Sequence, residues 1–387
     1  MIYLDNAAST PVHDKVIEEM IPYFKEQYGN PSSIHKYGRL ANIAIQNARK
    51  RIASLINAES SEILITSGGT ESNNTALYGI AHHNKGKHII TSSIEHDAIL
   101  EPCKRLEEEG FQITYLPVDK YGLVNPEDVE KEISHDTCLV SIMFANNEVG
   151  TIQPIADIGK ITHEKKIVFH TDAIQAVGKN QINVKEIDID LLSISSHKIN
   201  GPKGVGALYI RKGIKIDPLI LGGGQENGLR SGTENVASIV GFGIACQLAN
   251  DNIVQNQEHF RKLGMKLITD VLKEIPHTKF NGHPEKRIPN NIHFTFLGIN
   301  GEDLIIKLDE NKVAASTGSA CSVKVQKASH VLRAMGFSHE QITGSLRLTI
   351  GITNTEEEIN ETVQVLKKVV KELRAVSPYK EKYNFEI

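Results

Sequence analysis

Short apolar runs of strand length alternate with charged, periodic segments along the first two-thirds of the chain, and this alternation restricts the fold more than any other feature. The runs are rich in β-branched residues and predict strands at 62–66, 88–92, 113–118, 139–144, 167–171, 191–195 and 206–210. Helical segments such as 97–109 and 155–165 separate several of them. Continuous apolar strands with helical crossovers indicate an α/β fold, with a mostly parallel seven-stranded sheet covered on both faces. Such a sheet binds its ligand at the carboxyl ends of the strands.

The pattern changes after a long helical stretch at 235–275. A loop-like segment at 276–289 is followed by a strand at 291–296, a helix at 301–311, a strand at 345–350 and a terminal helix at 355–374. Glu356, Glu357 and Glu358 fall in the first turn of that helix, where its dipole favours acids. We therefore predict a large domain of residues 15–255 and a smaller α+β domain formed by residues 1–14 and 256–387.

Charge and cysteine content exclude several classes of protein. The 387 residues carry 43 Lys and Arg against 47 Asp and Glu, a net charge of −4 that argues against direct nucleic-acid or membrane binding. The cysteines at 103, 138, 246 and 321 are far apart and form no CxxC pair, which disfavours a disulfide scaffold or a zinc ribbon. No secretory signal and no apolar run long enough to span a bilayer are visible, so we expect a cytoplasmic location.

One predicted strand ends in a lysine. Residues 191–206 read LLSISSHKINGPKGVG, and Lys198 follows the apolar part. At the ligand crevice of a parallel sheet, desolvation lowers the pKa of a lysine and frees its amine for a Schiff base. The alternative is a surface lysine after a strand, which is the commoner arrangement for any single lysine.

Two other strand ends carry polar residues. Asp172 in HTDAIQ can pair with a cationic ring nitrogen of a bound cofactor, or it can cap a following helix, which this motif alone favours. The segment TSGGTESNN at 66–74 joins a strand to a helix, and its small residues suit either a phosphate at a helix N-terminus or a capping turn. The segment matches neither GxxxxGK[ST] nor GxGxxG, so a nucleotide loop is not supported.

Cys321 lies in a different setting from the other cysteines. It belongs to ASTGSACS at 315–322, a run of small residues that we expect to be mobile and exposed, as a reactive thiol requires. Taken alone, the segment favours a functional and a non-functional cysteine equally. Cys103, Cys138 and Cys246 fall within helix or strand patterns and are better interpreted as small buried hydrophobes.

Taken together, these features resemble the fold-type I pyridoxal phosphate (PLP) enzymes. They are a lysine at a strand end, an aspartate at the end of an earlier strand, and an anion-binding loop, all in a large domain that is followed by a small one. Longer strings narrow the resemblance. They are, in order, YLDNAAST, YGNPSSIH, TSGGTESNN, EHDAI, ANNEVGTIQP, TDAIQAVGK, SSHKINGPKGVG, RSGTEN, STGSACS and SLRLTIG. The series, from residue 3 to about 379, resembles the NifS/IscS-type cysteine desulfurases of the class V aminotransferase superfamily. STGSACS is similar to the group with a long, mobile cysteine loop.

The resemblance implies PLP as cofactor and assigns roles. Lys198 would hold PLP covalently, Asp172 would keep the pyridine nitrogen protonated, and His96 would stack on the ring and move protons. The phenolic oxygen would be bound by Gln175 and Asn147. The other cofactor contacts fall on Gly69, Thr70, Ser195, His197 and, from the neighbouring subunit of a homodimer, Thr233. The substrate carboxylate would be bound by Arg347 with help from Asn30.

The implied reaction removes sulfur from L-cysteine and leaves L-alanine. The Cys321 thiolate would attack the substrate sulfur and hold it as a persulfide, which passes to an iron–sulfur scaffold protein or another thiolation acceptor. A class V PLP aminotransferase, which needs no thiol at Cys321, and a selenocysteine lyase are the alternatives within enzymes. A non-catalytic sulfur carrier is disfavoured because Lys198, Asp172, His96 and Cys321 are all present. No metal site is expected, although three histidines cluster at 82, 83 and 88.

Overall fold

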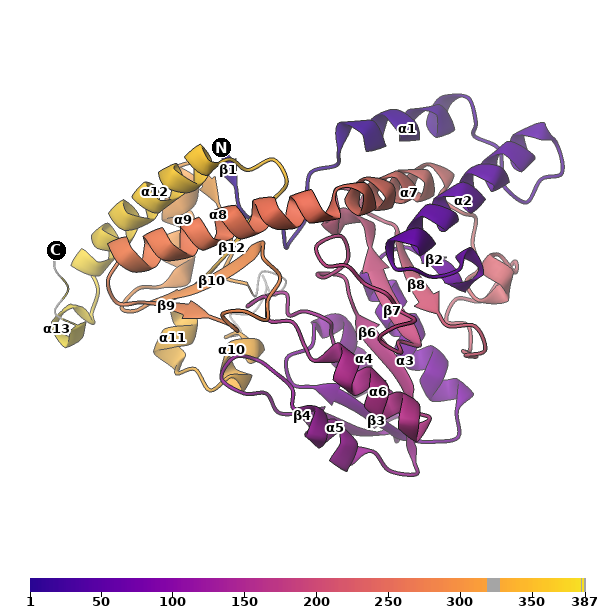
Figure 1. Cartoon of the computed structure of the whole chain (residues 1–387), viewed down its shortest axis with the longest axis horizontal. Helices are drawn as coiled ribbons and strands as arrows, with labels where there is room; N and C mark the ends of the chain where they lie inside the picture. The colour runs from indigo at the N-terminus through magenta and orange to yellow at the C-terminus, as the bar shows by residue number, and fades with distance from the viewer. Residues whose placement is uncertain (319–327, 384, 386–387) are drawn as a thin grey trace.

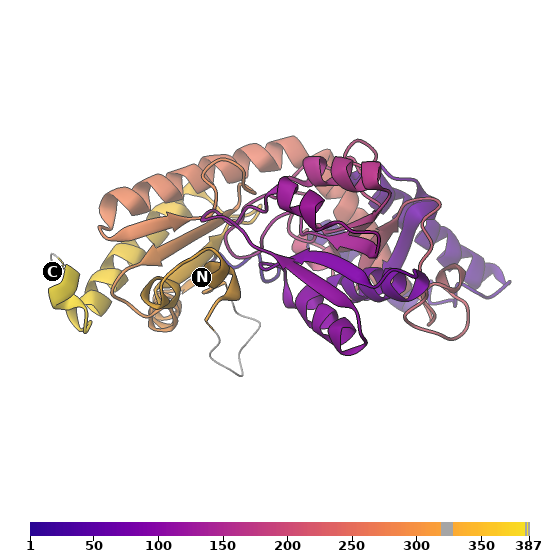
Figure 2. The ribbon, with the colours of Figure 1, turned by 90° about the horizontal axis from the view of Figure 1, so that it is seen from below.

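A computed structural model describes residues 1–318, 328–383 and 385. The chain forms two halves that lie side by side (Figure 1). The first two-thirds of the sequence, coloured indigo to magenta, builds one half, and the orange to yellow C-terminal third builds the other. The N-terminus lies with the C-terminal third rather than with the segment that follows it (Figures 1 and 2).

The larger half contains the predicted seven-stranded sheet, in the order β2-β8-β7-β6-β5-β3-β4. Only β8 runs antiparallel to its neighbours β2 and β7, and the other pairs are parallel, as predicted. The strands are β2 (Ile63–Thr66), β3 (His88–Ser92), β4 (Gln112–Leu116), β5 (Thr137–Ser141), β6 (Val168–Asp172), β7 (Leu191–Ser195) and β8 (Gly206–Ile210). The largest error in the predicted strands is at β5, which begins two residues before and ends three residues before the expected run.

Both faces of this sheet are covered. Successive strand residues point to opposite sides, so Leu191 belongs to one apolar core and Leu192 to another. The first core is completed by α3 (Gly69–His83) and α4 (Asp97–Glu108). The second is completed by α1 (Asp14–Lys25), α2 (Lys36–Leu55), α5 (Pro126–Glu132), α6 (Ile155–Lys165) and α7 (Val236–Asp251).

The smaller half combines a three-stranded antiparallel sheet, β12-β10-β9, with the parallel pair β1-β11. Its strands are β1 (Ile2–Tyr3), β9 (Thr278–Asn281), β10 (Asn291–Phe296), β11 (Val313–Ala314) and β12 (Ser345–Thr349). Its helices are α8 (Ile253–Glu274), α9 (Gly301–Glu310), α10 (His330–Ala334), α11 (His339–Thr343), α12 (Glu356–Ala375) and α13 (Lys380–Tyr383). The α+β character agrees with the prediction.

Two expectations for this region are wrong. The predicted helical stretch at 235–275 is two helices, because the chain leaves helical geometry at Asn252, whose side-chain amide donates to the Leu248 carbonyl at 2.8 Å. The segment 276–289 is not all loop, since it contains β9. This strand is four residues long, carries Lys279, and pairs with β10 alone, so it has the weak apolar signal of an edge strand.

The N-terminal segment links the two halves. Ile2 and Leu4 are buried in the same apolar core as Leu346 and Val363 of the C-terminal third. The segment then continues toward the large sheet, where the Ala7 and Ala8 carbonyls meet Lys198. This core is consistent with the predicted small domain of residues 1–14 and 256–387, whose boundaries remain a prediction.

Candidate active site

A cavity of about 380 Å³ lies at the carboxyl ends of β6 and β7. It brings together most of the residues singled out in the sequence, from positions far apart in the chain. They are Gly69, Thr70, His96, Asn147, Asp172, Gln175, Ser195, His197, Lys198 and Arg347. This is the edge of the sheet at which a parallel α/β fold binds ligands.

Lys198 sits in a single 3₁₀ turn, Ser196–Lys198, directly after β7. Its side chain is half-buried, and Nζ donates to the carbonyl oxygens of Ala7 at 2.6 Å and Ala8 at 2.9 Å. The side-chain amide of Gln175 donates to the same Ala7 carbonyl at 3.1 Å. The amine is therefore held inside the cavity by the N-terminal segment, and Lys198 is not a solvated surface lysine.

Asp172 is the last residue of β6 and is 6% exposed. One carboxylate oxygen accepts from the Asn73 side-chain amide at 2.7 Å, and the other accepts from the Ile174 backbone N–H at 3.0 Å. No helix begins there, so the helix-cap interpretation is wrong. The carboxylate is fixed at the cavity wall and is suited to pair with a cationic nitrogen of a bound group.

The N-terminus of α3 forms one end of the cavity. The helix begins at Gly69, and a Cβ built on this residue would lie 2.1 Å from Ile174 Cδ1, so a side chain here would push Ile174 into the cavity. Thr70, Ser195 and His197 line the same region. Free backbone N–H groups at a helix start, together with hydroxyl and imidazole donors, are the groups that bind phosphate.

His197 is a neutral donor at neutral pH. Burial, and next the charge of Lys198, lower the pKa of its imidazole to about 4. Its Nδ1 lies 3.2 Å from the Ser9 hydroxyl oxygen. An uncharged ring hydrogen-bonds a ligand without adding a second cation beside Lys198.

His96 caps the N-terminus of α4, since its Nδ1 accepts the Ala98 backbone N–H at 3.0 Å. In the neutral ring this bond leaves the proton on Nε2. The preceding residue, Glu95, is fully buried, and burial raises the pKa of its carboxyl to about 8. Its Oε1 accepts from the Ser92 hydroxyl at 2.6 Å and from the Met143 N–H at 2.9 Å.

Arg347 projects from β12 of the smaller half and is 3% exposed. Its guanidinium donates to Asp5 Oδ1 at 2.9 Å and to the carbonyl oxygens of Asn147 at 3.0 Å and Gly318 at 3.4 Å. Nε is buried without a partner among the described residues. The side chain therefore supplies a fixed positive charge at the wall opposite β6 and β7, suited to a carboxylate.

Two predicted site residues that the structure describes are not brought to this cavity. Thr233 lines a separate cavity with Ser67 and Arg230. Asn30 is exposed in the turn between α1 and α2, where its Oδ1 accepts from the Ser32 N–H at 2.9 Å. Cys321 lies outside the described residues. The roles assigned to these three remain predictions.

Several groups that support the cavity contribute atoms that no sequence pattern singles out. Asp5, Ala7 and Ala8 act partly through backbone carbonyls, and Asn73 supports Asp172 from inside α3. Their motifs YLDNAAST and TSGGTESNN were recognised, but not which atoms they contribute. The adjacency of Glu95 to His96 was the one available signal for that buried acid.

No metal-binding group of His, Cys, Asp and Glu is found within the described part of the chain. Of the histidines noted in the sequence, His82 and His83 pair with exposed acids, and His88 lies between two threonine hydroxyls. Among the helices the structure describes, none is long and apolar enough to cross a membrane.

Comparison with known proteins agrees with this geometry. The class-V aminotransferase family matches residues 2–362. A cysteine desulfurase IscS of Methanosarcina thermophila is 54% identical over 379 residues, covering 97% of this chain and 94% of that protein. A solved NifS-like protein superposes with a TM-score of 0.91 at 40% identity, covering 96% of this chain and all of the other. The solved structure of SspA in complex with cysteine gives a TM-score of 0.80 at 38% identity, covering 90% of this chain and 99% of the other.

Proposed function

The chain belongs to the class-V aminotransferase family, and we propose that it is a cysteine desulfurase, which removes sulfur from L-cysteine and leaves L-alanine. The observation that carries this proposal is the convergence of an amine, a carboxylate and a guanidinium, from Lys198, Asp172 and Arg347, around one cavity. These are the groups that a PLP enzyme acting on an amino acid requires. The relatives that share this chain's full length are named for this activity.

The described residues fit PLP. Lys198 offers an amine for covalent attachment, Asp172 a carboxylate for the pyridine nitrogen, and the start of α3 a phosphate cradle that a Cβ at Gly69 would disturb. A cavity of about 380 Å³ is within the range of natural cofactor sites. When bound, PLP supplies an electron sink that makes the Cα proton of an attached amino acid acidic.

The chain's own groups would then bind the substrate and move its protons. Arg347 binds the substrate carboxylate through its two terminal nitrogens, loosening its present bond to Asp5. Lys198 Nζ removes the Cα proton, and the Ala7 and Ala8 carbonyls aim this nitrogen. His96, with its proton on Nε2, donates a hydrogen bond or this proton to the reacting amino acid.

Cys321 would accept the sulfur as a persulfide. Gly318, which lines the cavity, is the last described residue before the segment that carries this cysteine. Three residues of chain span at most about 11 Å. The chain length from Gly318 thus allows Cys321 to reach the cavity, and the proposed mechanism also requires Cys321 to reach an external acceptor.

The experiment is to mix the PLP-loaded protein with L-cysteine and measure both products. Sulfide and alanine should appear in equal amounts when a reductant is present, and intact mass after brief exposure should show one added sulfur on the Cys321 peptide. Lys198→Ala should form neither product. Cys321→Ala should bind cysteine but carry no persulfide. If alanine is replaced by a keto acid that retains the sulfur, formed only when a second keto acid is added as amino acceptor, the protein is an aminotransferase, and if Cys321→Ala keeps its rate on selenocysteine, the lyase alternative is favoured.

We also propose a homodimer. Helices α1 and α2 expose an unusual number of large apolar side chains, namely Ile17, Ile21, Phe24, Tyr37, Leu40 and Ile43. A second copy would cover this surface, and the predicted role of Thr233 in a neighbour's cofactor site needs such a copy.

We further propose that an iron–sulfur scaffold protein or another thiolation protein accepts the sulfur. We also propose a cytoplasmic location, which suits three unpaired buried cysteines.

A further inference from the structure

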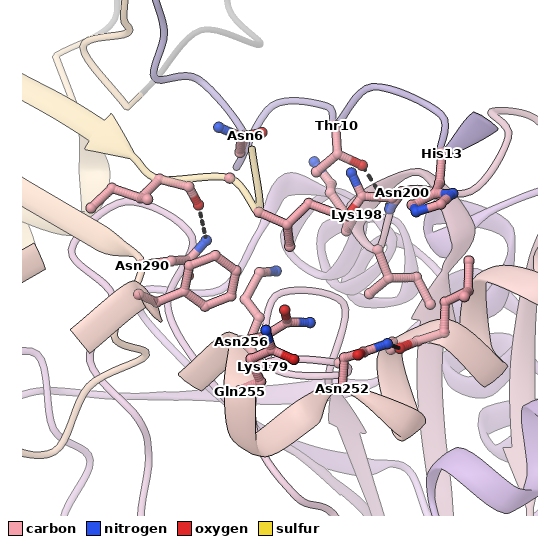
Figure 3. Close-up of a pocket in the computed structure, with 18 residues that line it drawn as sticks. Asn6, Thr10, His13, Lys179, Lys198, Asn200, Asn252, Gln255, Asn256 and Asn290 are labelled. Atoms are coloured by element: carbon pink, nitrogen blue, oxygen red, sulfur yellow. Dashed lines mark hydrogen bonds between the residues drawn. The ribbon is translucent and has the colours of Figure 1, made fainter. Parts of the chain in front are cut away.

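A second cavity, of about 270 Å³, adjoins the proposed active site, and Figure 3 shows the residues that line it. It is bounded by the N-terminal segment, the junction of α7 with α8, and the chain just after β12. Lys198 is the one residue common to the described linings of the two cavities. The exposed Gln255 lies at its rim, so small solutes can enter from solvent.

The lining of this second cavity is cationic and rich in amides. Besides Lys198 it contains Lys179 and His13, and its asparagines include Asn252 and Asn256. No aspartate or glutamate is among the described residues that line it. Figure 3 shows Lys179 among these asparagine side chains. Amide N–H groups around a cation form an environment for a negative charge rather than for a metal ion.

Lys179 is the key group because it is buried and forms no ion pair with any acid that the structure describes. It is 5% exposed, and its Nζ donates to the Gln175 carbonyl at 3.0 Å, which leaves two further N–H positions when the amine is protonated. Burial, and next the charge of Lys198, lower the pKa of its ammonium to about 7. A buried ammonium must lose its proton or gain an anion, since an unpaired charge in an apolar interior is unfavourable.

We infer that this second cavity binds a small carboxylate, held by Lys179 and the surrounding asparagine amides. In the PLP-loaded protein the proposed function commits the Lys198 amine to the cofactor, so Lys179 is the remaining lysine ammonium of the described lining; a singly charged anion matches it, whereas a dianion would leave an uncompensated negative charge. The cavity, at about 270 Å³, is also far larger than the roughly 30 Å³ that one water-sized ion fills, so an organic anion suits it better than chloride. The bound charge would lie beside Lys198, in a cavity whose described lining does not include Arg347.

The test is calorimetric titration of the PLP-loaded protein with acetate, which needs no turnover and so stands even if the desulfurase assignment fails. We expect a Kd of about 1 mM, which is weaker than the limit of about 40 μM for a ligand of four non-hydrogen atoms. Lys179→Met should lose one acetate per chain, or weaken that site by about tenfold or more. Lys203→Met is the matched control, because it removes an exposed lysine that does not line this cavity, and it should bind acetate as the wild type does.

A second variant keeps the proposal testable if Lys179→Met does not fold. Asn256→Asp places a carboxylate in the cavity, at a half-buried side chain, and should abolish acetate binding by supplying the missing counter-charge. The proposal is wrong if acetate binds to Lys179→Met or Asn256→Asp as tightly as to the wild type. It is also wrong if chloride binds at the Lys179-dependent site and acetate does not.

Discussion

Replacing Glu95 by Gln should make the protein more stable than the wild type, and the gain should grow with pH. Glu95 is completely buried, and burial raises the pKa of its carboxyl from 4.5 to about 8. The unfolded chain therefore releases this proton at a lower pH than the folded chain. Between these two pKa values, the free energy of unfolding of the wild type falls by about 1.4 kcal/mol for each pH unit.

Gln fits the same contacts without a proton to lose. Its carbonyl oxygen can accept from Ser92 and Met143 as Oε1 does, and its NH₂ takes the place of Oε2, which has no partner among the described residues. From about pH 5.5 to pH 7.5, the stability of Glu95→Gln relative to the wild type should therefore rise by about 2.5 kcal/mol. The structure sets this as an upper limit, because any relaxation around the ionised carboxylate reduces it.

Urea unfolding of both proteins at the two pH values measures the difference. Glu101→Gln, an exposed position on α4, is the control and should show no comparable change with pH. An equal stability difference between Glu95→Gln and the wild type at both pH values would contradict the reasoning. Glu95 would then be ionised in the folded protein, and its burial would have to be offset by a partner that the described contacts do not contain.

Three further outcomes follow from the geometry. Arg347→Lys should raise KM for L-cysteine by about tenfold or more, because one ammonium cannot replace the planar guanidinium that Asp5 already aligns. Steady-state kinetics measure this change, and an unchanged KM would contradict it. Gly69→Ala should weaken PLP binding by about tenfold, because the new Cβ displaces Ile174. Adding Ile174→Ala to the same chain should restore part of the PLP affinity. Equilibrium binding of PLP tests both variants, and full affinity of Gly69→Ala alone would refute the steric argument. Phe24→Glu should shift the proposed dimer toward monomer in analytical ultracentrifugation, whereas an unchanged sedimentation coefficient would remove this surface from the interface.

The fold was largely predictable because strands covered on both faces leave a strong apolar pattern. The runs that became β3, β7 and β8 were located to the residue. The pattern failed where burial is one-sided or brief, as at β9. The break at Asn252 was missed because a helical signal continues on both of its sides.

The residues of the candidate active site were harder to predict from the sequence than the fold. Strand-end position drew attention to Lys198 and Asp172, but only the family resemblance separated them from ordinary surface and capping residues. Neither approach could identify the contribution of Ala7, because a backbone carbonyl has no sequence signature and its position depends on a contact with Lys198 about 190 residues away. Such contacts are set by tertiary packing, which periodicity does not encode.

The placement of the first residues has a consequence for biosynthesis. Ile2 and Leu4 are synthesised long before the strand and helix that bury them, β12 and α12. Arg347 also arrives at that stage. During synthesis the segment around Ile2 and Leu4 therefore stays undocked, and the proposed active site stays incomplete, until β12 and α12 have been made.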